Sequence, residues 1–303
     1  MKGIMSRVSH SWFSPAIGLM NRLSFPQKFG LISFFFAIPV VLSLFFLTSR
    51  IQQQIELARL EIQGVEYLIP LHALNEELPR AMSLANAYLR KQQHAIEHYP
   101  IQQTKLDSLM ADLGEVDSLF GSKLDKTKRF PILRSSWEDL KTQIAKLSPE
   151  ISNEQFEKLS VDVQRFMSNV GDASTLILDP DLDSYYLMDA TLLKLPESSR
   201  IISKMRSMVG TRTLGGGMTE SDFSTLFAQA GLLRFNVDWI ERNLNVSFEN
   251  NPSGTVQPAI DQPLSQFVST NRALLRLLDE MATTNGPLNF RAEQFQNSSA
   301  AAL

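Results

Sequence analysis

The stretch FGLISFFFAIPVVLSLFFLTS, residues 29–49, contains no charged residue and is bounded by Lys28 and Arg50. A helix of this length is about 31 Å long, which matches the hydrocarbon core of a bilayer. The run is longer than the apolar region of a signal peptide and continues into LTSRIQQQIE without a small-residue cleavage site. Residues 29–49 are therefore predicted to form one uncleaved transmembrane helix, in which Pro39 is tolerated and introduces a kink.

The residues before this helix predict its orientation. Residues 1–28 carry Lys2, Arg7, Arg22 and Lys28 and no acidic residue. The positive-inside rule keeps such a tail in the cytoplasm and exports the rest of the chain. We therefore expect a basic cytoplasmic tail at 1–28 in a bacterial inner membrane, and a periplasmic main domain at 50–303.

The charge of the exported part limits its partners. The whole chain has 29 Lys and Arg and 32 Asp and Glu, so removing the four basic residues of the tail leaves 25 against 32, a net charge of −7. An acidic domain is a poor match for nucleic acid, whose binding depends on Lys and Arg. The predicted partners are the membrane and a small-molecule ligand or a periplasmic binding protein, with no nucleic acid.

Apolar spacing predicts that the exported domain is all-α. Between residues 51 and 71 apolar residues recur mainly at three- and four-residue steps, as in a helix with one buried stripe. This stripe consists of Ile51, Ile55, Leu57, Leu60, Ile62, Val65, Leu68 and Leu71. The helix is predicted to span 51–98 and to bend at Pro70 and Pro79. Further helices are predicted at 101–118, 132–147, 153–178, 181–210, 220–244, 258–284 and 288–303.

No convincing strand is found, and residues 245–248 are assigned to a loop. Turns are predicted at Gly121, at Ser148-Pro149 and at 249–258. The Gly215–Gly217 triplet is predicted to be a flexible connection, because a phosphate-binding loop needs a preceding strand and a following Gly-Lys-Ser/Thr. About 250 exported residues suffice for an extracytoplasmic antiparallel helical bundle, or for two stacked bundle modules.

The segment His94-Ala95-Ile96-Glu97-His98 matches the H-x-x-E-H pattern of some zinc proteases. Two histidines four residues apart share a helix face, so a metal site is geometrically allowed. The pair lies in a polar stretch where Pro100 is predicted to end the helix, and this favours an exposed helix end. With no cysteine, no G-x-S-x-G motif and only isolated histidines elsewhere, we expect no enzyme active site, no metal site and no cofactor.

The most distinctive local sequence is LILDPDLDSYYLMD, residues 176–189. Its alternating acids resemble the start of a calcium loop, but Ser184 and Ala190 replace the glycine and glutamate that such a loop requires. One explanation is structural: Asp179 caps a helix, Pro180 is its first residue, and Asp181 and Asp183 favour the positive helix end.

The other explanation is a ligand site. Aromatic and acidic groups gather near this helix start, where a small molecule fits between helices. The candidate ligand contacts are Asp183, Tyr185, Tyr186 and Asp189.

The segment LILDPDLDSYYLMDATLLKLPE, residues 176–197, resembles a signature of the extracytoplasmic sensor regions of bacterial methyl-accepting chemotaxis proteins. The same sensor type occurs in some sensor histidine kinases and diguanylate cyclases. SPAIGLMNRLSFPQKFGLI, residues 14–32, and ELARLEIQGVEYLIPL, residues 56–71, are similar to the segments that flank the first membrane helix of those receptors.

The resemblance implies a transmembrane chemoreceptor-type sensor, with a helical-bundle domain that binds a small solute or a binding protein and transmits binding by displacement of one helix. It also implies a homodimer. The alternatives are the sensor region of a histidine kinase or diguanylate cyclase, and an anchored interaction bundle without a small-molecule ligand. No uncharged run after residue 49 exceeds eleven residues, so no second membrane helix is expected, and the sequence is expected to be a sensor fragment or a shortened gene product.

Overall fold

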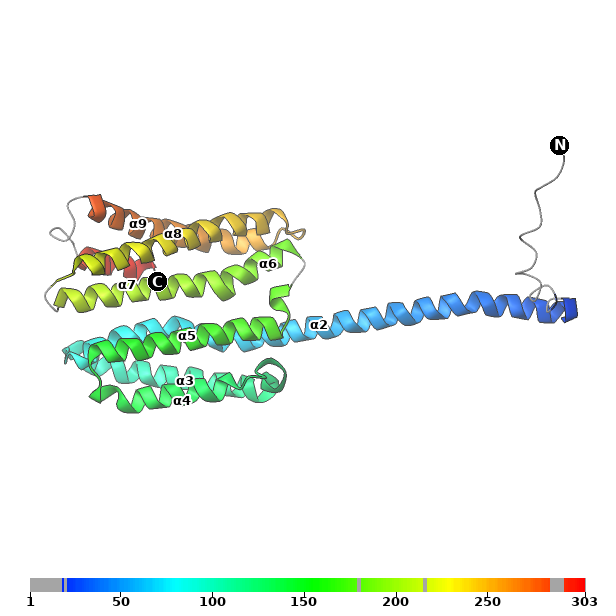
Figure 1. Cartoon of the computed structure of the whole chain (residues 1–303), viewed down its shortest axis with the longest axis horizontal. Coiled ribbons are helices and arrows are strands. Elements are labelled where there is room, and N and C mark those ends of the chain that lie inside the picture. Colours follow the sequence, from blue (N-terminus) through cyan, green and yellow to red (C-terminus); the bar gives the residue numbers. More distant parts are fainter. Residues whose placement is uncertain (1–17, 19–20, 179–180, 215–216, 284–291, 303) are drawn as a thin grey trace, which may run out of the picture. The chain divides into compact units, whose positions relative to one another are not determined.

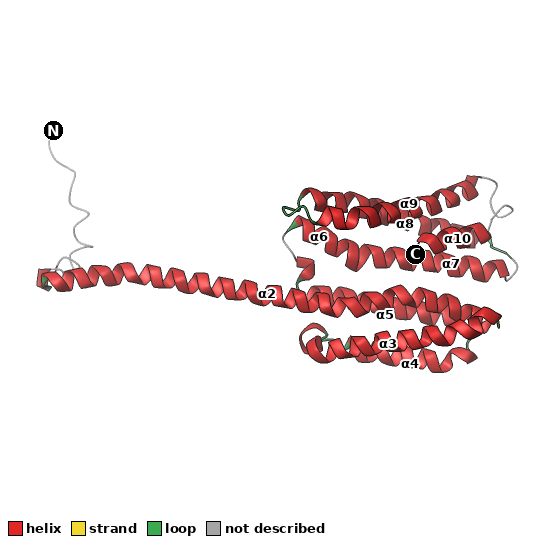
Figure 2. Cartoon of the chain, turned by 180° about the vertical axis from the view of Figure 1, so that it is seen from behind, coloured by secondary structure: helices red, strands yellow, loops and turns green. Residues whose placement is uncertain are grey.

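The computed structural model describes residue 18 and residues 21–178, 181–214, 217–283 and 292–302 (Figure 1). Every regular element in these ranges is a helix, which confirms the all-α prediction (Figure 2). The chain divides into two compact units, residues 1–58 and residues 59–303, which are described separately.

Helix α2, Phe25–Leu89, contains the predicted membrane segment. An 18-residue window near its start has a mean hydropathy of 2.5, and none of that window is buried. Phe34, Phe35 and Phe36 are each more than 60% exposed. Such a continuous exposed apolar surface is costly in water and favourable in lipid, so this part of α2 is a candidate membrane span. The helix continues without a break through Pro39, Pro70 and Pro79.

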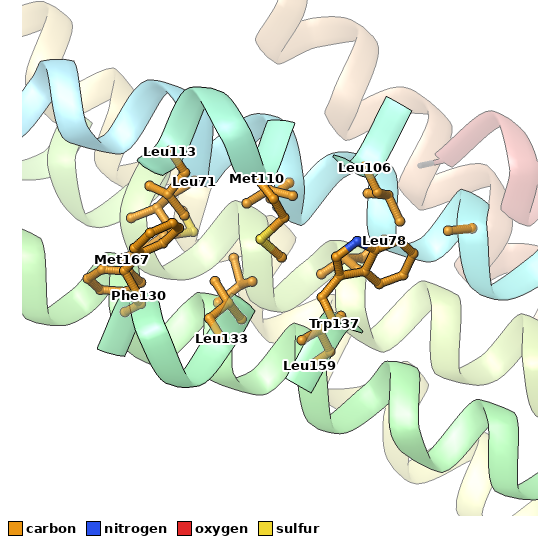
Figure 3. Close-up of a cluster of buried hydrophobic side chains, with 14 of the residues drawn as sticks. Leu71, Leu78, Leu106, Met110, Leu113, Phe130, Leu133, Trp137, Leu159 and Met167 are labelled. Carbon is orange, nitrogen blue, oxygen red and sulfur yellow. The ribbon is translucent and has the colours of Figure 1, made fainter. Parts of the chain in front are cut away.

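Residues 59–89 of α2 pack with α3 (Gln93–Leu124), α4 (Arg129–Gln143) and α5 (Pro149–Ala173) around one hydrophobic core. We call these helices the first group. A short 3₁₀ helix, η1 (Ile144–Lys146), extends α4. The buried side chains labelled in Figure 3 are Leu71 and Leu78 of α2, Leu106, Met110 and Leu113 of α3, Phe130, Leu133 and Trp137 of α4, and Leu159 and Met167 of α5.

Local chemistry sets the helix starts in the first group. The buried carboxylate of Asp125 accepts hydrogen bonds from the backbone N–H groups of Arg129 (2.8 Å) and Phe130 (2.9 Å), which have no partner within α4. Ser148 caps α5 by accepting from the N–H of Ile151, and Pro149 is the first helical residue. The predicted turn at Ser148-Pro149 is therefore confirmed.

The remaining helices form a second group with its own core. They are α6 (Leu182–Asp189), η3 (Ala190–Lys194), α7 (Leu195–Leu214), α8 (Glu220–Glu249), α9 (Val256–Thr283) and α10 (Ala292–Ala302). Thr219 and Asp222 form a capping box at the start of α8. The core includes Ile201, Met205 and Val209 of α7, Leu226, Leu233, Val237 and Ile240 of α8, Leu274 and Leu278 of α9, and Phe295 of α10.

The two groups meet along α5 and α7, which lie side by side in both views. Gln164 of α5 donates to the carbonyl of Pro196 in α7 (2.9 Å) and to Oδ1 of Asn75 in α2 (3.3 Å). η3 is a π-helical turn that supplies Leu192 to the first core and Ala190 to the second. Residues two positions apart in this turn thus reach different cores.

Three predicted boundaries are wrong. The turn predicted at Gly121 lies within α3, which continues to Leu124. The helix predicted at 51–98 ends at Leu89, because Lys91 takes a left-handed conformation (φ 58°) and the N–H of Gln92 bonds to the carbonyl of Ala87 (3.0 Å). The left-handed position of this Schellman motif is usually occupied by glycine. Because lysine occupies it here, the sequence does not indicate the end of the helix. A new helix, α3, starts at Gln93 and continues through Pro100.

α8 continues to Glu249 through residues 245–248, so the prediction of a loop there is wrong. The side-chain amide of Asn245 donates back to the carbonyl of Glu241 (2.8 Å), which holds this polar residue within the helix. Buried Ser247 further anchors the last turn by bonding to Asp183.

The prediction of a single apolar stripe on α2 is also wrong. Leu68 and Leu71 are buried in the first core, whereas Ile62, Val65 and Ile69 are 59%, 46% and 64% exposed. The apolar residues at three- and four-residue steps therefore divide between two faces of one helix. One face packs in the core and the other remains exposed in the described chain.

Candidate ligand-binding site

The acidic segment starts α6 later than predicted. α6 begins at Leu182 with Asp181 at its N-cap position, and Asp183 lies in its first turn. Asp179 and Pro180, which were predicted as the cap and the first residue, lie outside the described residues.

Asp183 links α6 to the far end of α8. Its Oδ2 accepts from the side-chain amide of Asn251 (2.8 Å), and its Oδ1 accepts from the N–H of Ser184 (2.9 Å). These two hydrogen bonds lower the pKa of the Asp183 carboxyl. The Asp183 carbonyl also accepts from the hydroxyl of buried Ser247 (2.7 Å). Both side-chain oxygens and the carbonyl are thus used within the fold.

The two tyrosines lie in an aromatic cluster at the surface of the second group. Tyr185 and Tyr186 meet edge to face with ring centroids 5.2 Å apart, and Tyr186 contacts Trp239 in the same way at 6.1 Å. The ammonium of Lys194 lies 5.5 Å from the ring centroids of both Trp239 and Phe235. This is a cation–π arrangement.

Asp189 is the most unusual of the four predicted residues. Its Oδ2 is buried and has no hydrogen-bond partner among the described residues. Burial raises the pKa of its carboxyl, and the nearby charge of Lys194 offsets only part of this effect. Asp183, Tyr185, Tyr186 and Asp189 therefore share one region of the second group, and their role in binding stays a prediction.

A separate cavity of about 480 Å³ lies between α2, α7 and α10. It is lined by residues from 79–92, 203–210 and 292–296. α10 is held against α7 by Gln296, whose side-chain amide donates to the carbonyl of Arg206 (3.0 Å). The volume of the cavity lies in the range of ordinary small-molecule sites. Because the walls come from segments more than 80 residues apart, no local motif in the sequence indicates this cavity.

Charged and polar side chains line this cavity unevenly. Its charged lining residues are Arg90, Arg206 and exposed Glu293. Burial lowers the pKa of Arg206, and no acidic residue in the described part of the chain pairs with it. Asn86 donates to Asn153 of α5, while its own Oδ1 is buried without a partner in the described ranges. The cavity thus has a net positive lining.

His94 and His98 lie in the first two turns of α3, at its start and not at the end of a helix as predicted. Both are exposed, and their rings stack with centroids 4.9 Å apart. Among the described residues, no group of three or more His, Cys, Asp or Glu side chains is arranged to hold a metal ion.

Comparisons of the chain with family models, with curated proteins and with solved structures find no match.

Proposed function

We propose that this chain is a membrane-anchored sensor of the chemoreceptor type, which binds a small molecule in the cavity between α2, α7 and α10. The proposal rests on one observation. α2 supplies a wall of the cavity through residues such as Met82 and Asn86, and the same helix contains the candidate membrane span. A molecule that binds in the cavity therefore contacts the helix that enters the membrane.

In this proposal residues 1–28 lie in the bacterial cytoplasm and the helical domain lies in the periplasm. The two groups act as two antiparallel bundle modules that share the α5–α7 contact. The ligand favours one packing of α2 against α7 and α10 over another, which is the general requirement for a ligand-driven switch. Small displacements of one helix against its neighbours are an established form of such a switch.

The proposed sensor is a homodimer that pairs through the exposed face of α2. Ile51, Ile55, Ala58, Ile62, Val65 and Ile69 follow one another at alternating steps of four and three residues. This is the spacing of a coiled-coil seam. Tyr67 and Leu71, on the opposite face of α2, are fully buried in the first core.

Blocking the cavity tests the proposal. Ser207 lines the cavity on α7, and Ser224 is exposed on α8 outside it. The purified full-length chain in detergent is screened by thermal shift against amino acids, organic acids, amides and polyamines. At least one compound is expected to raise the Tm of the wild type and of Ser224→Trp but not that of Ser207→Trp, since a ligand stabilises only a fold that binds it.

A panel without any stabilising compound contradicts a small-molecule sensor and favours an anchored interaction bundle. A shift that persists in Ser207→Trp places the binding site outside the cavity.

A further inference from the structure

The strongest chemical feature of the cavity is Arg206. Its side chain is half-buried on α7, its pKa is lowered by burial, and it has no ion pair with any described residue. Removing a charged group from water without a partner is unfavourable. A site that keeps such a group therefore gains most from a ligand that supplies the opposite charge.

The remaining polar groups of the lining are suited to the same kind of ligand. Arg90 is the second cation, at the end of α2, and the hydroxyls of Ser83 and Ser207 make no hydrogen bond within the described part of the chain. A planar guanidinium donates two parallel hydrogen bonds to a carboxylate, and hydroxyls add further donors. Two arginines against Glu293 give the lining a net charge of +1, in a domain that is acidic as a whole.

The size and the apolar part of the lining argue against a bare inorganic ion. Pro79, Met82, Ala87 and Ala292 contribute apolar surface to a cavity of about 480 Å³. Apolar walls are stabilised by contact with an apolar ligand body and contribute nothing to a small hydrated anion. The net charge of +1 matches one carboxylate better than two.

From these observations we infer that the cavity binds a small organic monocarboxylate, whose carboxylate pairs with Arg206 and whose apolar body lies against Met82 and Pro79. The inference rests on the proposed function, because it assigns a ligand class to the same site.

The test measures binding to the full-length chain by titration calorimetry. The probes are butyrate and benzoate, the primary amides of the same two acids, nitrate and phosphate. The variants are Arg206→Gln and Arg206→Lys, with Arg134→Gln as a control at an exposed position of α4 that also loses one positive charge.

At least one of the two carboxylates is expected to bind the wild type more tightly than its amide, nitrate or phosphate. Arg206→Gln should weaken this binding about 10- to 100-fold, the usual range for a charge-assisted hydrogen-bond pair. Arg206→Lys should weaken it less, and Arg134→Gln by less than about twofold. The Tm of ligand-free Arg206→Gln should equal or exceed that of the wild type, since an unpaired half-buried charge is removed.

Other results overturn the inference. Equal binding of amide and acid, unchanged affinity in Arg206→Gln, or stronger binding of nitrate or phosphate each contradicts a monocarboxylate site. If an amide binds the wild type and this binding is lost in Ser207→Trp, the cavity binds a small molecule that is not a carboxylate. The proposed sensor function then stands, but the ligand class is wrong. If none of these probes binds, the monocarboxylate assignment fails, and the proposed function fails with it only if the thermal-shift panel also contains no stabilising compound.

Discussion

Gly64 of α2 lies against Ser174, the residue that follows α5. A Cβ atom at this position would overlap with Cβ and Oγ of Ser174 and lie 3.0 Å from Cδ1 of Leu176. Ser174 is fully buried, and its hydroxyl already donates to the carbonyl of Val170 (2.7 Å). The absence of a side chain at Gly64 therefore permits this close contact.

Gly64→Ala is expected to lower the free energy of unfolding by about 1–3 kcal/mol, because overpacking outweighs the gain in helix propensity. Gly231→Ala, at an exposed position of α8 with no atom within 4 Å of the new Cβ, is the control and should raise it by about 0.5–1 kcal/mol. Urea unfolding of the purified chain measures both. An unchanged or higher stability of Gly64→Ala would show that α2 and α5 are not in close contact there.

Glu77 joins α2 to α3 by a small charged network. Its carboxylate, in a residue only 6% exposed, accepts from Lys105 (2.7 Å), Gln102 (2.8 Å) and Arg80 (2.9 Å). Burial alone would raise the pKa of Glu77, but the hydrogen bonds from Lys105 and Gln102, together with the charges of Arg80 and Lys105, outweigh it and lower the pKa.

A lowered pKa in the folded state gives Glu77 a stabilising effect above its ordinary pKa of about 4.3, and this effect is lost as the pH falls through the lower folded value. The Tm of the wild type should therefore exceed that of Glu77→Gln at pH 7, and the difference should shrink below about pH 4. Thermal unfolding from pH 3 to 7 measures it, with exposed Glu97→Gln as the control. Parallel curves for wild type and Glu77→Gln over this range would contradict the network.

At the scale of elements, periodicity predicted which segments are helical but not how their faces are used. The apolar spacing along 51–71 correctly predicts a helix. However, Leu71 packs in the core and Ile69 is exposed, because the apolar residues lie on two faces of this helix. The break after Leu89 depends on a left-handed lysine at position 91, a conformation that the residue type does not indicate. Pro100 is accommodated within α3, although proline usually ends a helix.

The exposed face of α2 predicts contact between two copies of this helix. The chain has no cysteine, so a single introduced cysteine reports on one position. Ile55→Cys lies in the proposed seam and should form a disulfide-linked dimer in oxidised membranes. Gln53→Cys, exposed two residues earlier on the opposite side of the heptad pattern, should cross-link much more slowly. Equal rates at the two positions on non-reducing gels would argue against the seam.

At the scale of the whole molecule, the all-α class and the apolar segment at 29–49 could be predicted, because they depend on composition and local spacing. The cavity could not, since Arg90, Arg206 and Gln296 come together only when three distant segments fold. The acidic segment at 176–189 has an unusual local sequence. In the structure Asp183 accepts hydrogen bonds from Asn251 and Ser247. These bonds attach α6 to α8, which explains the presence of one of the acidic residues.

The central claim is that a molecule in the cavity changes the state of α2. The most direct measurement is the cross-linking rate of Ile55→Cys in membranes, with and without a saturating concentration of the tighter-binding of butyrate and benzoate, in chains with and without Ser207→Trp. The account predicts at least about a twofold change in rate with Ser207 and none with Ser207→Trp, because the ligand favours one packing of α2. An unchanged rate in a chain shown by calorimetry to bind that carboxylate would contradict it.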